Sequence, residues 1–317
     1  MNSIKWAKDK GRSRLADFVR REVQKSVDQE VLPIISQLVQ FQNSGAQDRQ
    51  SYYDHTKSPL ENHTLYVGLR DRLEAISVAI QDVDIDISDF DNWLRDFPEI
   101  KRHYQTMGDV FIEKCLEHYL AFRQLNVVES DVFVDIAAGE SPWTGILNSN
   151  GIKSYRLDFA YPEGMHGVNI GADAGDTKLP DEFASVLSLH SAFECFMGDA
   201  DIQFVREAAR ILIKGGRYGI VPLFLDDAYF NSTSPDWNQR DVVIDPGAKK
   251  VWWDDEYRSP FSRHYSPESF GKRIFENIPE IMTGKVLYFR NLTEVMKYYQ
   301  GQRIYCFFMF YCTKTGK

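Results

Sequence analysis

Four short apolar segments, each closed by an acid or a histidine, constrain the fold of this chain more than any other feature. They cover residues 131–135, 154–158, 168–173 and 184–190. A segment with helical periodicity, 200–212, and a fifth apolar segment, 218–222, follow them. Short apolar runs that alternate with helices or short crossovers are typical of a mostly parallel sheet covered on both faces. We therefore expect an α/β fold with a doubly wound sheet.

Acidic residues stand where the first three of these strands end, at Asp135, Asp158 and Asp173. In an open α/β sheet, ligands bind beyond the carboxyl ends of the strands. A carboxylate after the second strand can accept hydrogen bonds from both ribose hydroxyls, and one after the third can accept from the amino group of adenine. Small residues at 137–139 would let backbone amides approach a ligand closely. The sequence predicts a site for an adenine nucleoside.

The same segments resemble the ordered motifs of class I S-adenosylmethionine-dependent methyltransferases. The motifs are Asp135–Gly139, Asp158, Asp173–Ala174, Leu179–Ser188 and Glu207–Gly216. The resemblance covers about residues 100–225 and implies a seven-stranded, mostly parallel Rossmann-like sheet whose last pair of strands, at 285–291 and 303–312, includes one antiparallel strand. One departure concerns the turn after the first strand, where three family glycines correspond to Ala137, Gly139 and Ser141.

The resemblance also assigns roles to single residues. S-adenosylmethionine would be the cofactor, with Asp135, Ala137 and Gly139 beside its methionine part. Asp158 would bind the ribose, and Asp173 and Ala174 the adenine. For Asp158 and Asp173 the alternative is an exposed loop acid without a ligand.

The base expected in such an enzyme stands at the end of the fourth strand. His190 could take the proton of an acceptor hydroxyl, because an imidazole titrates near neutral pH. Glu194, four residues on, would fall on the same helical face and orient the imidazole, or serve as the base itself. The alternative is that His190 only packs against the cofactor or hydrogen-bonds to it.

Two groups of residues are candidates for the acceptor-binding surface. The first precedes the first strand, where this family often builds a lid, and consists of His103, Tyr104, Lys114 and His118. The second follows an insertion at 223–260 and consists of Arg263, His264 and Tyr265. Solvated helix residues and core packing are the respective alternatives. No metal site is expected, because these histidines lack a tight ligand spacing. Within the insertion, 242–245 and 250–253 read as a hairpin.

Residues 1–95 read as a helical N-terminal extension, and residues 96–317 as the methyltransferase domain. Residues 1–25 carry eight Lys or Arg against three Asp or Glu, whereas the whole chain has a net charge of −9. Apolar residues recur at helical spacing from Leu15 to Leu38. Such a basic amphipathic helix suits self-association into a homo-oligomer or peripheral contact with an anionic membrane, or it presents a solvated face. The acidic remainder argues against nucleic acid as a partner.

The sequence therefore predicts a cytoplasmic enzyme that methylates a small molecule or a saccharide, with a hydroxyl as the expected acceptor. None of the four cysteines forms a CxxC pair, which fits a reducing compartment. No apolar run is long enough for a transmembrane helix, and the start lacks the apolar core of a secretory signal. Two other classes stay open: a catalytically silent methyltransferase-like scaffold, and a membrane-surface interaction protein.

Overall fold

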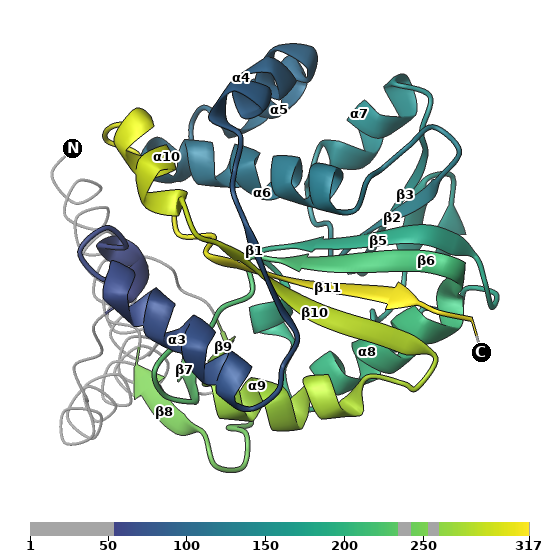
Figure 1. The fold of residues 1–317 in the computed structure, drawn as a ribbon. Helices are drawn as coiled ribbons and strands as arrows, with labels where there is room; N and C mark the ends of the chain where they lie inside the picture. Colours follow the sequence, from purple (N-terminus) through teal and green to yellow (C-terminus); the bar gives the residue numbers. More distant parts are fainter. Residues whose placement is uncertain (1–53, 234–241, 253–259, 317) are drawn as a thin grey trace, which may run out of the picture. The chain divides into compact units, whose positions relative to one another are not determined.

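An eight-stranded sheet forms the centre of the computed structural model, which describes residues 54–233, 242–252 and 260–316 (Figure 1). The strand order is β1-β10-β11-β6-β5-β2-β3-β4. The strands are β1 Ile80–Val83, β2 Val132–Ile136, β3 Lys153–His166, β4 Asn169–Gly171, β5 Ala184–His190, β6 Leu212–Val221, β10 Met282–Phe289 and β11 Phe308–Lys314. Strand β11 runs antiparallel to β6 and to β10, and the other pairings are parallel. The expected doubly wound sheet with one reversed strand near its end is confirmed.

Helices cover both faces of this sheet, as Figure 1 shows. On one face lie α4 Ile87–Asp96, α5 Pro98–Tyr104, α6 Phe111–Gln124, α7 Trp143–Ser149 and α10 Leu292–Tyr298. On the other lie α3 His63–Ala75, α8 Ala200–Ile211 and α9 Pro267–Arg273. Every residue of β5 before His190 is buried, as a strand covered on both faces requires. Helix α9 begins with a capping residue and a proline: the Ser266 hydroxyl accepts from Ser269 N, and Pro267 lies in the first turn.

The eighth strand, β1, was not expected, since Ile80 continued the helical spacing of residues 69–76. Helix α3 ends at Ala75, and Ser77 adopts a φ of 64°, which turns the chain into an extended segment. That segment pairs with β10, Ile80 opposite Val286. The described residues on both sides of the expected boundary at 95 and 96 belong to one compact unit.

The insertion forms a separate three-stranded sheet, in the order β8-β7-β9. Its strands are β7 Phe230–Thr233, β8 Lys249–Trp252 and β9 Ser262–His264. The expected hairpin of 242–245 with 250–253 is wrong, because β8 pairs in parallel with β7 and residues 242–248 form no strand. The Asp245 backbone N–H instead donates to Asn231 Oδ1, 2.7 Å away. Because the Asn231 side chain takes this N–H, the N–H is not available for pairing with a strand.

The link between β3 and β4 also differs from expectation. An irregular loop was predicted there, because few residues separate Asp158 from Asp173. Strand β3 instead continues through Asp158 to His166, and β4 follows after a glycine turn at Gly167, whose φ is 65°. No helix lies between the two strands, so the connection is short, as expected. Its residues extend β3 instead of forming a loop.

Several expectations fall on other parts of the chain. The basic segment of residues 1–25 and the apolar stripe up to Leu38 lie outside the described residues, as do Trp237 and Trp253. In the described ranges, no helix combines the length and apolarity needed to cross a bilayer. Cys115, Cys306 and Cys312 are buried in the core, whereas Cys195 is exposed.

Asn291 fastens the end of β1 to the rest of the sheet. Its side chain accepts from Ile85 N at 2.8 Å and donates to Ile85 O at 3.0 Å. These two hydrogen bonds take the place of the backbone pairing that ends with β1. We expect Asn291→Ala to lower the free energy of unfolding by about 1–3 kcal/mol, because both backbone groups lose their partner. Urea unfolding measures this change. The exposed Asn92→Ala is the control, and an equal loss in both variants would contradict the assignment.

Candidate active site

The turn after β2 is built as a sharp left-handed bend. Ala137 and Gly139 have φ values of 53° and 50°, so an alanine occupies a conformation that costs non-glycine residues roughly 1–2 kcal/mol. Asp158 holds this bend: its Oδ2 accepts from Gly139 N and its Oδ1 from Ala160 N, both at 2.9 Å. The Tyr161 hydroxyl also donates to Gly139 O. Asp158 is buried, so the alternative of an exposed loop acid does not hold for it.

Asp173 follows β4 and is exposed, in contrast to Asp158. Its Oδ1 accepts from Gly175 N at 2.7 Å, which closes a short turn. Ala174 beside it is half-buried against the core. The Asp173 carboxylate therefore lies just after β4, where the sequence predicts an acid, and it is exposed to solvent.

Asp135 and His190 meet where β2 and β5 end. The Asp135 Oδ1 atom lies 3.3 Å from His190 Nδ1, and Ser188 Oγ lies 3.0 Å from His190 Nε2. Asp135 is 1% exposed, and its Oδ2 is buried without a hydrogen-bond partner among the described residues. Both nitrogens of His190 thus already contact protein groups, while Asp135 retains an unused acceptor.

His118 covers the imidazole of His190 from helix α6. The two ring centres are 4.1 Å apart, and His118 Nε2 lies 2.9 Å from the Tyr104 hydroxyl. Burial, together with His190 and Lys114, lowers the pKa of His118 well below its usual value, so this ring is neutral at physiological pH. His103 is exposed and contacts Tyr104 edge to face. Of the expected lid residues, the structure places Tyr104, Lys114 and His118 at the strand ends.

A buried polar face of α6 lies against the first residue after β5. Lys114 Nζ donates to Glu117 Oε1 at 2.7 Å and to Ser191 Oγ at 2.6 Å, and Ser191 Oγ donates to Glu117 Oε1 at 2.9 Å. Glu113 is also buried, and burial together with Glu117 raises its pKa to about 8. The sequence reading missed Glu113, Glu117 and Ser191. Two glutamates one helical turn apart within an apolar stripe were the available signal.

Glu194 does not contact His190. The expected helical spacing fails because Ser191 adopts a φ of 47° and only a single 3-10 turn follows, Phe193–Cys195. Glu194 instead faces a cavity of about 280 Å³. The cavity is lined mostly by apolar atoms, and the residues around it include Lys114, Ser191, Glu194, Phe224, His264 and Tyr305. His264, one of the expected acceptor-binding residues, also lines this cavity.

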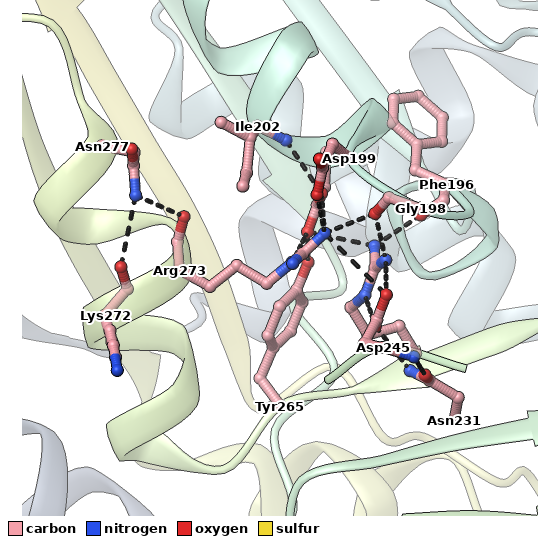
Figure 2. A network of polar contacts seen from close by, with 12 residues as sticks. Phe196, Gly198, Asp199, Ile202, Asn231, Asp245, Tyr265, Lys272, Arg273 and Asn277 are labelled. Carbon is pink, nitrogen blue, oxygen red and sulfur yellow. Dashed lines mark hydrogen bonds and ion pairs between the residues drawn. The ribbon is translucent and has the colours of Figure 1, made fainter. Parts of the chain in front are cut away.

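Arg263 and Tyr265 are not at the mouth of any site, contrary to expectation. Both are fully buried, because β9 pairs with β7 and turns them toward the body of the protein. Arg263 donates to Asp245 Oδ2 at 2.6 Å and lies 3.0 Å from Asp201 Oδ2, and the Tyr265 hydroxyl donates to Asp201 at 2.6 Å. Figure 2 shows this network, in which Arg273 contacts the same acids. Arg263 thus links the insertion, through Asp245, to the carbonyl oxygens of Phe196 and Gly198 in the loop after β5.

Of the known proteins compared, only solved structures resemble the chain. No family model matches the sequence, and no curated protein matches it. Among solved structures, the chain is similar to a 1,6-didemethyltoxoflavin N1-methyltransferase of Burkholderia thailandensis, with 10% identity, coverage of 72% of this chain and 87% of that one, and a TM-score of 0.42. For a methyltransferase of Methanosarcina mazei the values are 14%, 62%, 97% and 0.39, and for the CcbJ methyltransferase of Streptomyces caelestis 13%, 63%, 89% and 0.39.

The strand order of the central sheet identifies the fold. Strand β2 lies between β3 and β5, the chain runs outward on each side of it, and one reversed strand, β11, stands near the far edge. The fold is the class I methyltransferase fold. The described chain adds β1 to the seven strands that the sequence resemblance predicts.

Arg263 pairs with two buried carboxylates, Asp201 and Asp245. Its loss would leave Asp245 with only the more distant Arg273, 3.9 Å away, as a nearby cation among the described residues. We expect Arg263→Ala to lower the free energy of unfolding by about 3–5 kcal/mol, the usual cost of breaking a buried ion pair. The control Arg102→Ala removes an exposed pair with Glu99 and should cost less than about 1 kcal/mol. Urea unfolding compares the two. An Arg263→Ala variant as stable as the control would show that the network does not support the fold.

Proposed function

We propose that this protein transfers a methyl group from S-adenosylmethionine to a hydroxyl of a small molecule or a saccharide. The observation that carries the proposal is the buried pair Asp135–His190, which stands beside the left-handed turn at the switch point between β2 and β5. Ligands of open α/β sheets bind at such switch points. Bound S-adenosylmethionine would supply a methyl group on a positively charged sulfur, an electrophile that needs alignment rather than activation.

The residues present fit that cofactor. Asp135 Oδ2 is a buried acceptor without a donor, which suits the ammonium group of the methionine part or a water bound to it. A carboxylate offers about four acceptor positions, so Asp158 can receive the ribose hydroxyls besides the two amides it already holds. A Cβ at Gly139 would meet no atom within 4 Å, so the turn faces open space. Ala137, Asp173, Ala174 and His190 complete the proposed set.

In this proposal His190 is a positioning residue. Its Nδ1 and Nε2 lie within hydrogen-bond distance of Asp135 and Ser188, so neither nitrogen is open to an acceptor hydroxyl. The imidazole fixes the Asp135 carboxylate and fills the space under His118. The second candidate, a silent scaffold, is favoured by the single glycine and the strained Ala137 of the turn. Cofactor binding without methyl transfer to any acceptor would support the scaffold.

Asp158 gives the first test. We expect Asp158→Ala to weaken binding of S-adenosylmethionine roughly 10-fold to 150-fold, because charge-assisted hydrogen bonds are lost and the turn at Gly139 loosens. Isothermal titration calorimetry measures the affinity, with the exposed Glu129→Ala as control. An unchanged affinity in folded Asp158→Ala would contradict the ribose assignment. No binding of S-adenosylmethionine to the unaltered chain would contradict the proposed function.

His190 gives the second test. We expect His190→Ala to weaken cofactor binding while turnover at saturating cofactor changes little, because the variant removes the partner that orients Asp135. The pH dependence of the saturated rate should then be the same in both proteins. If affinity stays constant and turnover falls by roughly 10²–10⁴, the usual contribution of a general base, His190 is the base after all.

A further inference from the structure

The cavity beside the end of β5 contains a carboxylate oxygen that lacks a donor. Glu194 lines the cavity, and its Oε2 is buried without a hydrogen-bond partner among the described residues. A buried acceptor left without a donor costs about 1–3 kcal/mol. A ligand that donates a hydrogen bond to this atom would recover that free energy.

Lys114 and Ser191, which line the same cavity, are already engaged with Glu117 and with each other. Lys114 is bound to Glu117 and Ser191, so its ammonium does not neutralise Glu194 by direct contact. The rest of the wall is largely apolar and includes the rings of Phe224 and Tyr305. The cavity therefore combines an apolar surface with one unused acceptor.

We propose that this cavity binds the methyl acceptor, and that the acceptor is a compact, largely apolar molecule whose hydroxyl donates a hydrogen bond to Glu194 Oε2. The proposal rests on the proposed function. At about 280 Å³ the cavity is at the lower end of ligand pockets, so it fits one ring rather than a long chain of sugars. Ser191, on its wall, directly follows His190, which places the cavity beside the proposed cofactor site.

Glu194 is also suited to receive the proton of the acceptor. Burial, together with Glu117, raises the pKa of Glu194 to about 7, although a hydrogen bond from its own backbone N–H and the charge of Lys114 lower it. The other titratable or charged residues that line the cavity are Asp54, Cys195, His264, Arg303 and Tyr305. In the transfer, the O–H bond of the acceptor breaks, and the acceptor oxygen forms a bond to the methyl carbon. The sulfonium sulfur keeps the electron pair of its broken bond, and the proton goes to Glu194.

Small probe molecules test the pocket without turnover. We expect benzylamine to bind with an affinity that rises between pH 6 and pH 8, because Glu194 is ionised above a pKa of about 7. Toluene, without a donor, and benzoate, with a like charge, should bind more weakly. In Glu194→Gln the affinity for benzylamine should fall roughly 10-fold to 100-fold and lose its pH dependence, since the charged acceptor is gone. The exposed Glu129→Gln is the matched control. Ligand-observed NMR titration measures each affinity.

Alkylation of Cys195 gives a second measurement that needs no Glu194 variant. Cys195 lines the cavity and is exposed, whereas burial raises the pKa of Cys115 and of Cys312 to about 12 and that of Cys306 well above its usual value. Iodoacetamide should therefore modify Cys195 first, and benzylamine should slow this reaction more than toluene or benzoate does.

Two results would overturn the proposal: equal binding of benzylamine and benzoate, or Cys195 alkylation that no probe slows. Calorimetry with S-adenosylmethionine on the same samples separates this outcome from failure of the proposed function. Benzylamine binding without cofactor binding keeps the pocket and rejects methyl transfer. Cofactor binding without benzylamine binding keeps the cofactor site and rejects the pocket.

Discussion

The contact between Lys114 and Glu117 determines the state of the polar groups at the carboxyl edge of the sheet. It places a buried ammonium and a buried carboxylate between α6 and Ser191, with Glu113 one turn away on the same helix. Burial opposes the charge on Lys114, but Glu117 and its neighbours raise the pKa of Lys114 well above its usual value, so it stays charged. Because this cation is held by Glu117, burial controls Glu113 and Glu194, and their pKa values rise to about 8 and 7.

In this arrangement His190 and Glu194, which the sequence predicted on one helical face, lie in different surroundings. His190 lies between Asp135 and Ser188 under the neutral ring of His118, where it orients a carboxylate. Glu194 lies on the other side of Ser191, where its oxygen meets a cavity rather than a protein donor. The left-handed backbone at Ser191 produces the separation, because it turns the chain away from the direction of β5.

The insertion supports the same region from a distance. Arg263, on β9, also donates to the carbonyl oxygens of Phe196 and Gly198, which follow Glu194 along the chain (Figure 2). Asp245 and Asp201 neutralise this guanidinium within a fully buried site. A segment read from sequence as a loop at a substrate mouth is therefore a structural link that fixes the loop carrying the cavity wall.

Local sequence determined most strands of the central sheet and their order along the chain. Strands β2, β5 and β6, helix α8 and the cap of α9 follow from apolar periodicity and capping residues, which depend on neighbours in the chain. The positions of Asp135 near the end of β2, of Asp158 within β3 and of Asp173 after β4 follow from the same patterns. Tertiary structure alone decided that Ile80 joins a strand beside β10, that Arg263 is buried, and that Glu194 faces a cavity instead of His190. Each of these depends on a partner far away in sequence, and no local pattern specifies that partner.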